Sequence, residues 1–423
     1  MTHAVVLGAG IAGLLAARVL ADAFDEVTVV ERDVNVAPGP RRGVPQGAHL
    51  HGLLDGGRQL LEELYPGVVD ELAAAGAPSV EPLRDTRWYI HGRRLAGDTS
   101  GMRSVLATRP FLEAALRARA LALPGVALRH GTATGLVERG VDAVGGVVLR
   151  DGSLPADLVV DASGRSSRLP GWLAQLGHPT PPEQRVDVDL GYATRLYSRV
   201  PPTAFSGVTV STVPRFRGGA CVAVEGDRWL VTLAGMLGDH PPTDPAGFTA
   251  WAATLPAPDI AAVIAEAEPL NDPLPYRFRG SRWRRYDQVR LPGGVISVGD
   301  AVCSLNPLYA QGMTLAAQQV RILRQQLTGT STVDPRAFHR ATARVCAAAW
   351  GVATRSDLAM PEVDGRRPIR TRLLDDYVRR VQLAAHHDPV VARAFMRVAN
   401  LTDPPSTLLA PRLMVRALAQ GSR

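Results

Sequence analysis

The sequence predicts an α/β fold in which a domain built on a parallel sheet is interrupted by an antiparallel sheet and followed by a helical C-terminal part. Two glycine-rich turns, at 8–13 and 299–313, each follow a short apolar run. Residues 186–290 contain segments that alternate apolar and polar side chains, which is typical of strands with one buried face. Residues 335–400 have a mainly helical pattern.

The first glycine-rich turn has the form of a Rossmann-like, dinucleotide-binding unit. An apolar strand over 3–7 leads into the turn, and a helix is expected over 14–23. In such a unit the first glycine permits the tight turn, the second lets the backbone approach a pyrophosphate, and the third lets helix and sheet pack closely. These glycines are Gly8, Gly10 and Gly13.

The residues after this turn also suit a nucleotide. The helix start at Ile11 and Ala12 would offer N–H groups and a partial positive charge to phosphates. A β-branched strand over 27–30 ends at Glu31, which follows Gly13 by 18 residues. That spacing is close to the spacing of a ribose-binding acid in dinucleotide-binding folds.

Local patterns predict the other elements. Proline near the first turn and apolar residues at helical spacing predict a helix over 110–122. The apolar run 295–298 is expected to return to the first sheet. Also predicted are a loop over 33–48, a helix over 53–64, a hairpin over 88–95, a small meander over 126–149, a buried strand over 158–160, a long strand over 186–200, a hairpin over 219–237 and a helix over 314–327.

These elements divide the chain into three predicted parts. Residues 1–80, 101–185 and 291–330 would form a discontinuous cofactor-binding domain. Residues 81–100 and 186–290 would form a substrate-binding sheet domain, and residues 331–423 a helical C-terminal region.

Composition excludes several classes of protein. The 423 residues are 46% hydrophobic and 21% charged, so the chain can bury a core and is not disordered. All 47 basic residues are arginine, which excludes any mechanism that needs a catalytic lysine. The arginines are scattered, so the net charge of +7 does not form the basic stripe of a nucleic-acid-binding protein.

The same survey bears on location and metal binding. The three cysteines are widely spaced, which favours neither disulfides nor zinc, and no metal site is expected. The chain starts directly in a strand and has no long apolar run, so neither a secretory signal nor a transmembrane helix is expected. These observations predict a cytoplasmic protein, either a monomer or a homodimer.

Three polar segments could add to the nucleotide site. Arg42, in the loop that follows the second strand, could reach a cofactor phosphate because guanidinium offers several directed donors. Arg109 stands just before a predicted helix and could also contact the cofactor. Asp161 ends a strand and enters a turn of small residues, which allows the backbone to approach a nucleotide closely.

The second glycine-rich turn completes the set. Asp300 ends a predicted strand and could accept a hydrogen bond from a ribityl hydroxyl. The turn then enters a helix whose N–H groups could stabilise negative charge on a reduced ring. Its residues are Pro307, Gln311, Gly312 and Met313. Cys303 in this segment is expected to be a packing residue. A single cofactor held by both turns must be large, as FAD is.

These motifs, in this order, resemble those of the class A flavoprotein monooxygenases, which share the fold of p-hydroxybenzoate hydroxylase. The resemblance covers most of residues 1–330 and implies FAD held by the first turn, Glu31 and Arg32. It also implies cofactor contacts for Arg109, Asp161 and Asp300. The family's Gly-Ala-Asp-Gly is replaced here by Asp161-Ala162-Ser163-Gly164, which leaves the contact of Asp161 open.

A narrower similarity is to bacterial polyether epoxidases of the monensin and lasalocid type. It rests on Arg-Gly-Val-Pro-Gln-Gly-Ala-His-Leu-His at 42–51, on His-His-Asp-Pro at 386–389 and on Asp-Pro-Pro at 403–405. The resemblance implies that NADPH or NADH reduces FAD and that O2 forms a flavin C4a-hydroperoxide. One oxygen atom would then pass to an apolar polyketide or isoprenoid intermediate of natural-product, such as antibiotic, biosynthesis, by epoxidation or hydroxylation.

Other functions remain open at this point. A flavin-dependent reductase of isoprenoid double bonds would use the same FAD site without inserting oxygen. A dehydrogenase using NAD would explain residues 8–31 but not 300–313, and a binding protein with a structural nucleotide is a further alternative. A flavin-dependent halogenase would need a lysine, and the chain has none.

The substrate is expected between the sheet of 186–290 and the cofactor. His49 and His51 follow the loop after the second strand, and His49 could contact substrate or only hydrogen-bond the loop. Strand periodicity places alternate residues on one face but does not show which face meets the cofactor. The lining candidates are Tyr192, Arg195, Phe216, Cys221, Val222, Val224, Leu233 and Met236.

Overall fold

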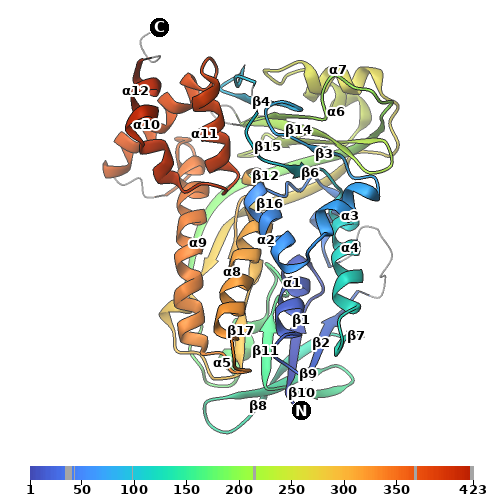
Figure 1. Ribbon diagram of the computed structural model, residues 1–423, viewed down its shortest axis with the longest axis vertical. Coiled ribbons are helices and arrows are strands. Elements are labelled where there is room, and N and C mark those ends of the chain that lie inside the picture. The colour runs from blue at the N-terminus through green and yellow to red at the C-terminus, as the bar shows by residue number, and fades with distance from the viewer. Residues whose placement is uncertain (34–40, 42, 98, 213–215, 366–368, 420–423) are drawn as a thin grey trace.

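The computed structural model describes residues 1–33, 41, 43–97, 99–212, 216–365 and 369–419. Figure 1 shows a parallel sheet with helices at one end of the molecule and a large, mainly antiparallel sheet at the other. The C-terminal helices lie beside the large sheet, and the long helix α9 (Pro335–Leu358) runs along one side of the molecule. The predicted α/β architecture is therefore confirmed, whereas the exact domain boundaries stay a prediction.

The parallel sheet has five strands in the order β17-β11-β1-β2-β7. Their bounds are β1 His3–Leu7, β2 Glu26–Glu31, β7 Val126–His130, β11 Leu158–Asp161 and β17 Val295–Ser297. All four strand pairs are parallel, so the carboxyl ends of the strands lie at one edge. The return of 295–298 to this sheet is confirmed.

One predicted element was wrong in part. The run 126–149 was expected to be a meander, but β7 pairs in parallel with β2. The reason is that α4 (Arg109–Leu121) precedes β7 and carries the chain back across the sheet, as parallel pairing requires. The meander is formed by β8 Ala133–Glu138, β9 Val144–Leu149 and β10 Gly152–Pro155.

Helices α1 (Ile11–Leu20), α4 and α8 (Gly312–Gln326) pack with the parallel sheet in one apolar core. Leu20 of α1, Leu116 of α4 and Val320 of α8 are fully buried in it. Proline at the second position of α4 and the Thr108 side chain, which accepts from the N–H of Phe111, fix the start of that helix. Helices α2 Asp55–Leu64, α3 Val68–Ala74 and α5 Leu169–Gln175 complete this end.

The large sheet has eight strands in the order β18-β16-β12-β15-β14-β13-β4-β5. Their bounds are β4 Thr86–Ile90, β5 Arg93–Arg94, β12 Glu183–Ser198, β13 Gly207–Val210, β14 Arg217–Val224, β15 Arg228–Gly235, β16 Leu274–Arg284 and β18 Cys303–Ser304. Every pair is antiparallel except β13 with β4. The predicted long strand and both predicted hairpins are confirmed.

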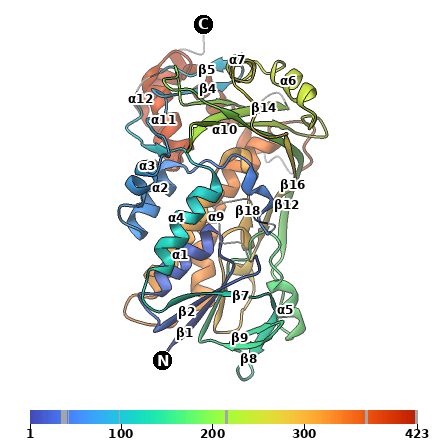
Figure 2. The ribbon, with the colours of Figure 1, turned by 90° about the vertical axis from the view of Figure 1, so that its right-hand side faces the viewer.

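Strands β12 and β16 form a ribbon that connects the two ends of the molecule (Figure 2). It pairs Glu183 with Arg284 near the parallel sheet and Thr194 with Leu274 at the other end, with a bulge at 187–190. Helices α6 (Pro245–Ala252) and α7 (Asp259–Glu266) cover one face of the large sheet. The ribbon therefore extends the large sheet towards the parallel sheet.

The remaining elements are short or C-terminal. Helices α10 Ile369–Ala384, α11 Pro389–Ala399 and α12 Pro411–Ala419 follow α9, as the pattern over 335–400 predicts. Ala385 and Met396 from this part pack on Ile90 and Leu95 beside β4 and β5. The short elements are β3 Ser79–Val80, β6 Ser104–Val105, η1 Pro45–Ala48, η2 Tyr286–Gln288, η3 Gly299–Ala301, η4 Pro307–Tyr309 and η5 Pro405–Leu409. No helix in the described ranges is long and apolar enough to cross a membrane.

Three glycines allow distant segments to pack backbone to backbone. Gly8 has a φ of +104°, and a Cβ on it would lie 2.8 Å from the carbonyl oxygen of Ala162. A Cβ on Gly13 would overlap the carbonyl oxygen of Gly8, and one on Gly299 would lie 2.8 Å from the Cβ of Ala12. These distances are too short for real atoms, so larger residues at these positions would force the turns apart.

We expect Gly13→Ala to destabilise the protein by several kcal/mol, because the new methyl group meets backbone that cannot move away. Gly351→Ala is the matched control, since Gly351 also lies in a helix but has open space around it. That control should be neutral or should stabilise by about 0.5–1 kcal/mol. Equal midpoints of urea unfolding for the two variants would contradict the packing described here.

Candidate active site

The candidate site begins where the carboxyl ends of the parallel strands meet. The N–H of Gly8 donates to Val30 at 2.8 Å, and the N–H of Ala162 donates to Leu7 at 3.0 Å. The N–H of Val298 donates to Asp161 at 2.9 Å. The first glycine-rich turn, Glu31, the Asp161 turn and the second glycine-rich turn are thereby brought to one edge of the sheet, the usual place for ligands in open α/β sheets.

A chain of alternating charges stands over the first turn. Glu31 accepts from the backbone N–H of Ala9 at 2.8 Å and from Arg41 at 2.9 Å. Arg41 also donates to Glu113 at 2.7 Å, and Glu113 accepts from Arg109 at 2.9 Å. A Cβ on Gly10 would lie about 4 Å from both guanidinium groups, so the cluster faces that glycine.

Glu31 is ionised in this setting. Burial acts to raise the pKa of Glu31, but the N–H groups of Asp33 and Ala9 and the charge of Arg41 outweigh it and lower the pKa. Arg32 points elsewhere and donates to the carbonyl oxygen of Gly43 at 3.3 Å. Arg42, also predicted to contact the cofactor, lies outside the described residues.

Asp161 acts within its own turn. Its carboxylate is fully buried and accepts from the N–H of Ser163 at 3.1 Å and from the hydroxyls of Ser163 and Ser167, each at 2.5 Å. Its backbone carbonyl also accepts from Val298. The carboxylate of Asp161 therefore bonds to residues of its own turn, and these bonds fix the shape of the loop beside Gly8.

Arg284, which is buried at the end of β16, ties the two turns to the large sheet. It donates to Ala301 at 2.7 Å, to the carbonyl oxygen of Arg165 at 3.1 Å and to Glu183 at 3.1 Å. Arg282 also donates to the carbonyl oxygen of Arg165. One guanidinium therefore connects the Asp161 turn, η3 and the start of β12.

Asp300 faces several arginines at the second turn. Burial raises the pKa of Asp300, while the charges of Arg109, Arg165 and Arg282 act to lower it. Its Oδ1 would lie 3.7 Å from a Cβ on Gly312, so Asp300 sits at the start of α8. Arg109 thus acts electrostatically on Asp300 and hydrogen-bonds Glu113 of the first cluster, which links the two predicted halves of the site.

The other predicted residues of this turn differ in exposure. Gln311 and Met313 are buried, Gly312 is half-buried and Pro307 is exposed. The Oε1 of Gln311 is buried and has no hydrogen-bond partner among the residues that the structure describes. Such an orphaned acceptor at a helix start is typical of a group that meets a ligand.

Tyrosines and a histidine line the face of the large sheet next to this turn. Tyr192 and Tyr276 stack with ring centroids 6.2 Å apart, and His49 lies 5.3 Å from Tyr276. The Nδ1 of His49 is 2.7 Å from the hydroxyl of Thr194. Asp300 and Arg165 act on the pKa of Tyr276, which burial raises, so this aromatic group adjoins the second turn.

Both histidines near this face are uncharged at neutral pH. Burial lowers the pKa of His49 to about 4. Burial, helped by the charge of Arg109, lowers the pKa of His51 to about 3, and the Nδ1 of His51 lies 2.9 Å from the carbonyl oxygen of His49. The site therefore offers neutral imidazoles.

Strand register divides the predicted lining residues between two faces. Val222 has the same orientation as Thr194 and Tyr192, because it pairs with Leu230, which pairs with Leu196. Phe216 and Met236 pack in the cluster of Tyr192, so they too lie on that side of the sheet. Arg195, Cys221 and Leu233 do not join them: Cys221 and Leu233 pack under α6 and α7, and Arg195 donates to Asn271.

Asp357, near the end of α9, is a buried acid beside this face. Its Oδ1 accepts from the amide of Asn306 at 2.8 Å and from the hydroxyl of Tyr309 at 2.7 Å. Burial raises the pKa of Asp357 to about 6. Its Oδ2 has no hydrogen-bond partner in the part of the chain that the structure describes.

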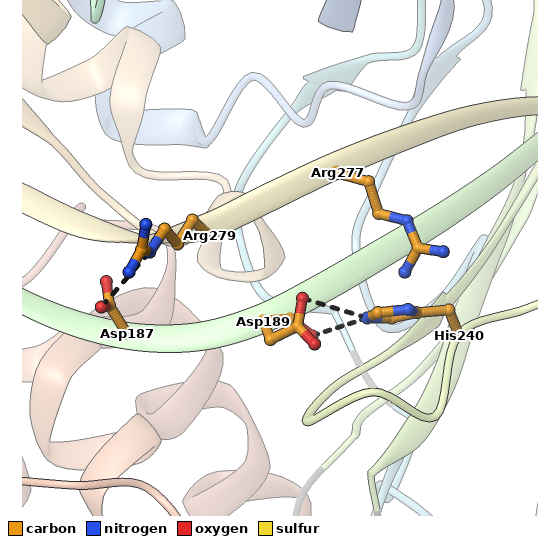
Figure 3. A pocket seen from close by; sticks show the side chains of 5 residues that line it. All are labelled: Asp187, Asp189, His240, Arg277 and Arg279. Carbon is orange, nitrogen blue, oxygen red and sulfur yellow. Dashed lines mark hydrogen bonds and ion pairs between the residues drawn. The ribbon is translucent and has the colours of Figure 1, made fainter.

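A cavity of about 590 Å³ lies elsewhere, at the bulge of β12. It is lined by Asp187, Asp189, His240, Arg277 and Arg279. Figure 3 shows Asp189 joined to His240, with the Asp187–Arg279 pair beside them. None of the predicted cofactor or substrate residues lines this charged cavity.

Comparison with known proteins settles the family. A family described as "FAD binding domain" matches residues 1–356. The chain belongs to this FAD-binding family. It is 35% identical over 453 aligned positions to Protein Rv3254 of Mycobacterium tuberculosis (strain ATCC 25618 / H37Rv), with 100% of this chain and 94% of that protein covered.

Solved structures agree on the fold. The flavin-dependent brominase Bmp2 matches with a TM-score of 0.69 at 16% identity over 100% of both chains. A flavoprotein/dehydrogenase from Cytophaga hutchinsonii matches with a TM-score of 0.71 at 16% identity, covering 100% of this chain and 98% of that one. The fold is that of the class A flavoprotein monooxygenases, as the sequence predicts.

The geometry fits FAD. The backbone at Gly8 and Gly13 leaves no room for a side chain, and Arg41 and Arg109 face Gly10, where they could neutralise phosphate charge. Glu31 would receive the ribose end, and Asp300 with the orphaned Gln311 would receive the ring end. These assignments rest on position and chemistry.

Sequence reasoning missed several residues of this candidate site. Arg41, which donates to Glu31, was not among the predicted residues. Glu113 was overlooked, but its four-residue spacing from Arg109 on a helix was a usable signal. Arg165, Tyr276 and Asp357 left no comparable signal, because only the fold brings them near Asp300 and Tyr192.

We expect Glu31→Gln to weaken FAD binding about tenfold to a hundredfold, because a charged acceptor is lost and Arg41 keeps only Glu113 as an anionic partner. Quenching of flavin fluorescence on titration measures this. Glu26→Gln, at the exposed start of the same strand, is the control and should bind FAD like the wild type. Unchanged affinity in Glu31→Gln would refute the assignment of Glu31.

Asp357 should make stability depend on pH. Its pKa of about 6 in the folded protein lies above the ordinary value of 3.8, so it favours folding below pH 4, and this contribution is lost as the pH rises through 6. The free energy of unfolding of Asp357→Asn should therefore rise by about 2 kcal/mol relative to that of the wild type between pH 4 and pH 7. Urea unfolding at both pH values tests this, with exposed Asp364→Asn as a control that should show no such gain.

Proposed function

We propose that this protein is an FAD-dependent monooxygenase that uses NADPH or NADH and O2 to place one oxygen atom in an apolar small molecule. The observation that carries the proposal is the position of the Tyr192–Tyr276–His49 face directly beside the Asp300 turn. FAD bound at that turn would supply the electron transfer and oxygen activation that no side chain can provide.

The protein's own residues would position the substrate and exclude water. Tyrosine rings bury a large apolar area and offer a hydroxyl at one end. Because His49 and His51 are neutral, they do not attract the counter-ions or water that charged groups would hold. This composition supports an apolar substrate such as a polyketide or isoprenoid intermediate, with epoxidation or hydroxylation as the reaction.

The fold alone does not choose the reaction. Similar structures include the brominase above and a protein described as the Diels-Alderase PyrE3, at 20% identity and a TM-score of 0.63. A flavin-dependent halogenase would need a lysine, and the chain has none, which disfavours halogenation. A reductase of isoprenoid double bonds would use the same FAD site, so the origin of the product's oxygen separates the two functions.

The test is turnover of apolar candidate substrates by the purified yellow protein under oxygen-18 gas, with NADPH and NADH supplied in turn. We expect substrate-stimulated oxidation of the nicotinamide and a product that carries one oxygen-18 atom. A product that contains two added hydrogens and no new oxygen would establish the reductase instead. Turnover restricted to small charged aromatic acids would refute the proposed substrate class.

A further inference from the structure

Asp357 is an unusual group for an apolar site. It is fully buried, and no arginine is among the residues that shift its pKa; only burial, Tyr309 and Asn306 do so. Buried carboxylates are normally paired with a cation or fully hydrogen-bonded. Here Oδ1 takes both donors, and Oδ2 takes none within the described chain.

The position of Asp357 connects it with the aromatic face. The pKa of Tyr192 is raised mainly by burial, then by Tyr276, and then by the charge of Asp357. Asp357 accepts a hydrogen bond from the hydroxyl of Tyr309, which lies in η4. This turn precedes α8, whose start is the proposed ring end of the FAD site. Leu308, on the same turn, packs in the apolar cluster of Tyr192. A free acceptor therefore lies at the edge of an otherwise neutral site.

We propose that Asp357 is a specificity-determining residue whose Oδ2 accepts a hydrogen bond from a hydroxyl or amino group on an otherwise apolar substrate. The proposal rests on the proposed function for the location of the substrate, but not on the reaction. Asn306 and Tyr309 hold Oδ1, which leaves Oδ2 as the recognition atom. An unpaired buried acceptor discriminates strongly, because an analogue without the donor leaves it unsatisfied.

The substitution Asp357→Asn reverses the polarity of that atom. Both neighbours of Oδ1 donate, so the amide oxygen is expected to remain there and the amide nitrogen to take the place of Oδ2. A donor then replaces an acceptor at nearly constant shape. The variant should therefore prefer a substrate group that only accepts.

The probes are three compounds with one skeleton: tetralin, 1-tetralone and 1-tetralol. Binding to the FAD-loaded protein at pH 8 is measured from the change in the flavin absorption spectrum. The wild type should bind the alcohol at least about tenfold more tightly than the hydrocarbon and the ketone. Asp357→Asn should lose this advantage and favour the ketone, while the exposed control Asp364→Asn should keep the wild-type order.

The readout is the order in which each variant binds the three probes. A general loosening of the site would weaken all three and would not change this order. Should Asp357→Asn not fold, Asp357→Ala, which removes the acceptor, must abolish the advantage of the alcohol. Equal binding of alcohol and ketone by the wild type, an unchanged order in the variants, or no binding of any probe would each overturn the proposal. The oxygen-18 experiment tests the reaction independently, so the two failures are distinguishable.

Discussion

Close backbone contact at the carboxyl edge of the parallel sheet is the constraint on which the rest of the structure depends. Gly8 lies against Ala162, the third glycine of its turn lies against Gly8 itself, and Gly299 lies against Ala12. These contacts join three segments that are far apart in the chain. Without them the acid and arginine side chains of the site would not share one edge.

Electrostatics divides the site into two regions of different character. Over the first turn, Glu31 and Glu113 alternate with Arg41 and Arg109, so the two carboxylates hold the arginines in place. On the sheet face the side chains are aromatic or neutral. A cofactor with a charged tail and a flat ring suits both regions at once, which is consistent with the family to which the chain belongs.

Spacing along the chain was sufficient to predict the fold class and the two glycine-rich turns, because short-range patterns fix strand ends and turns. It was not sufficient to single out Arg41, whose contacts with Glu31 and Glu113 exist only in the folded chain. Alternation in β14 and β15 separates Val222 from Leu233, but only the packing of α6 and α7 shows which face is covered. Asp357 is brought to Tyr309 by a long helix, and no local pattern encodes that meeting.

The anchoring of β16 by Arg284 fixes where the rest of that strand lies relative to the Asp161 and Asp300 turns. Tyr276 stands eight residues before Arg284 on the same strand. Because Arg284 is held at these two turns, the number of residues between Arg284 and Tyr276 sets the position of Tyr276. Removing or adding two residues between these positions would move the tyrosine by about 7 Å and keep it on the same face.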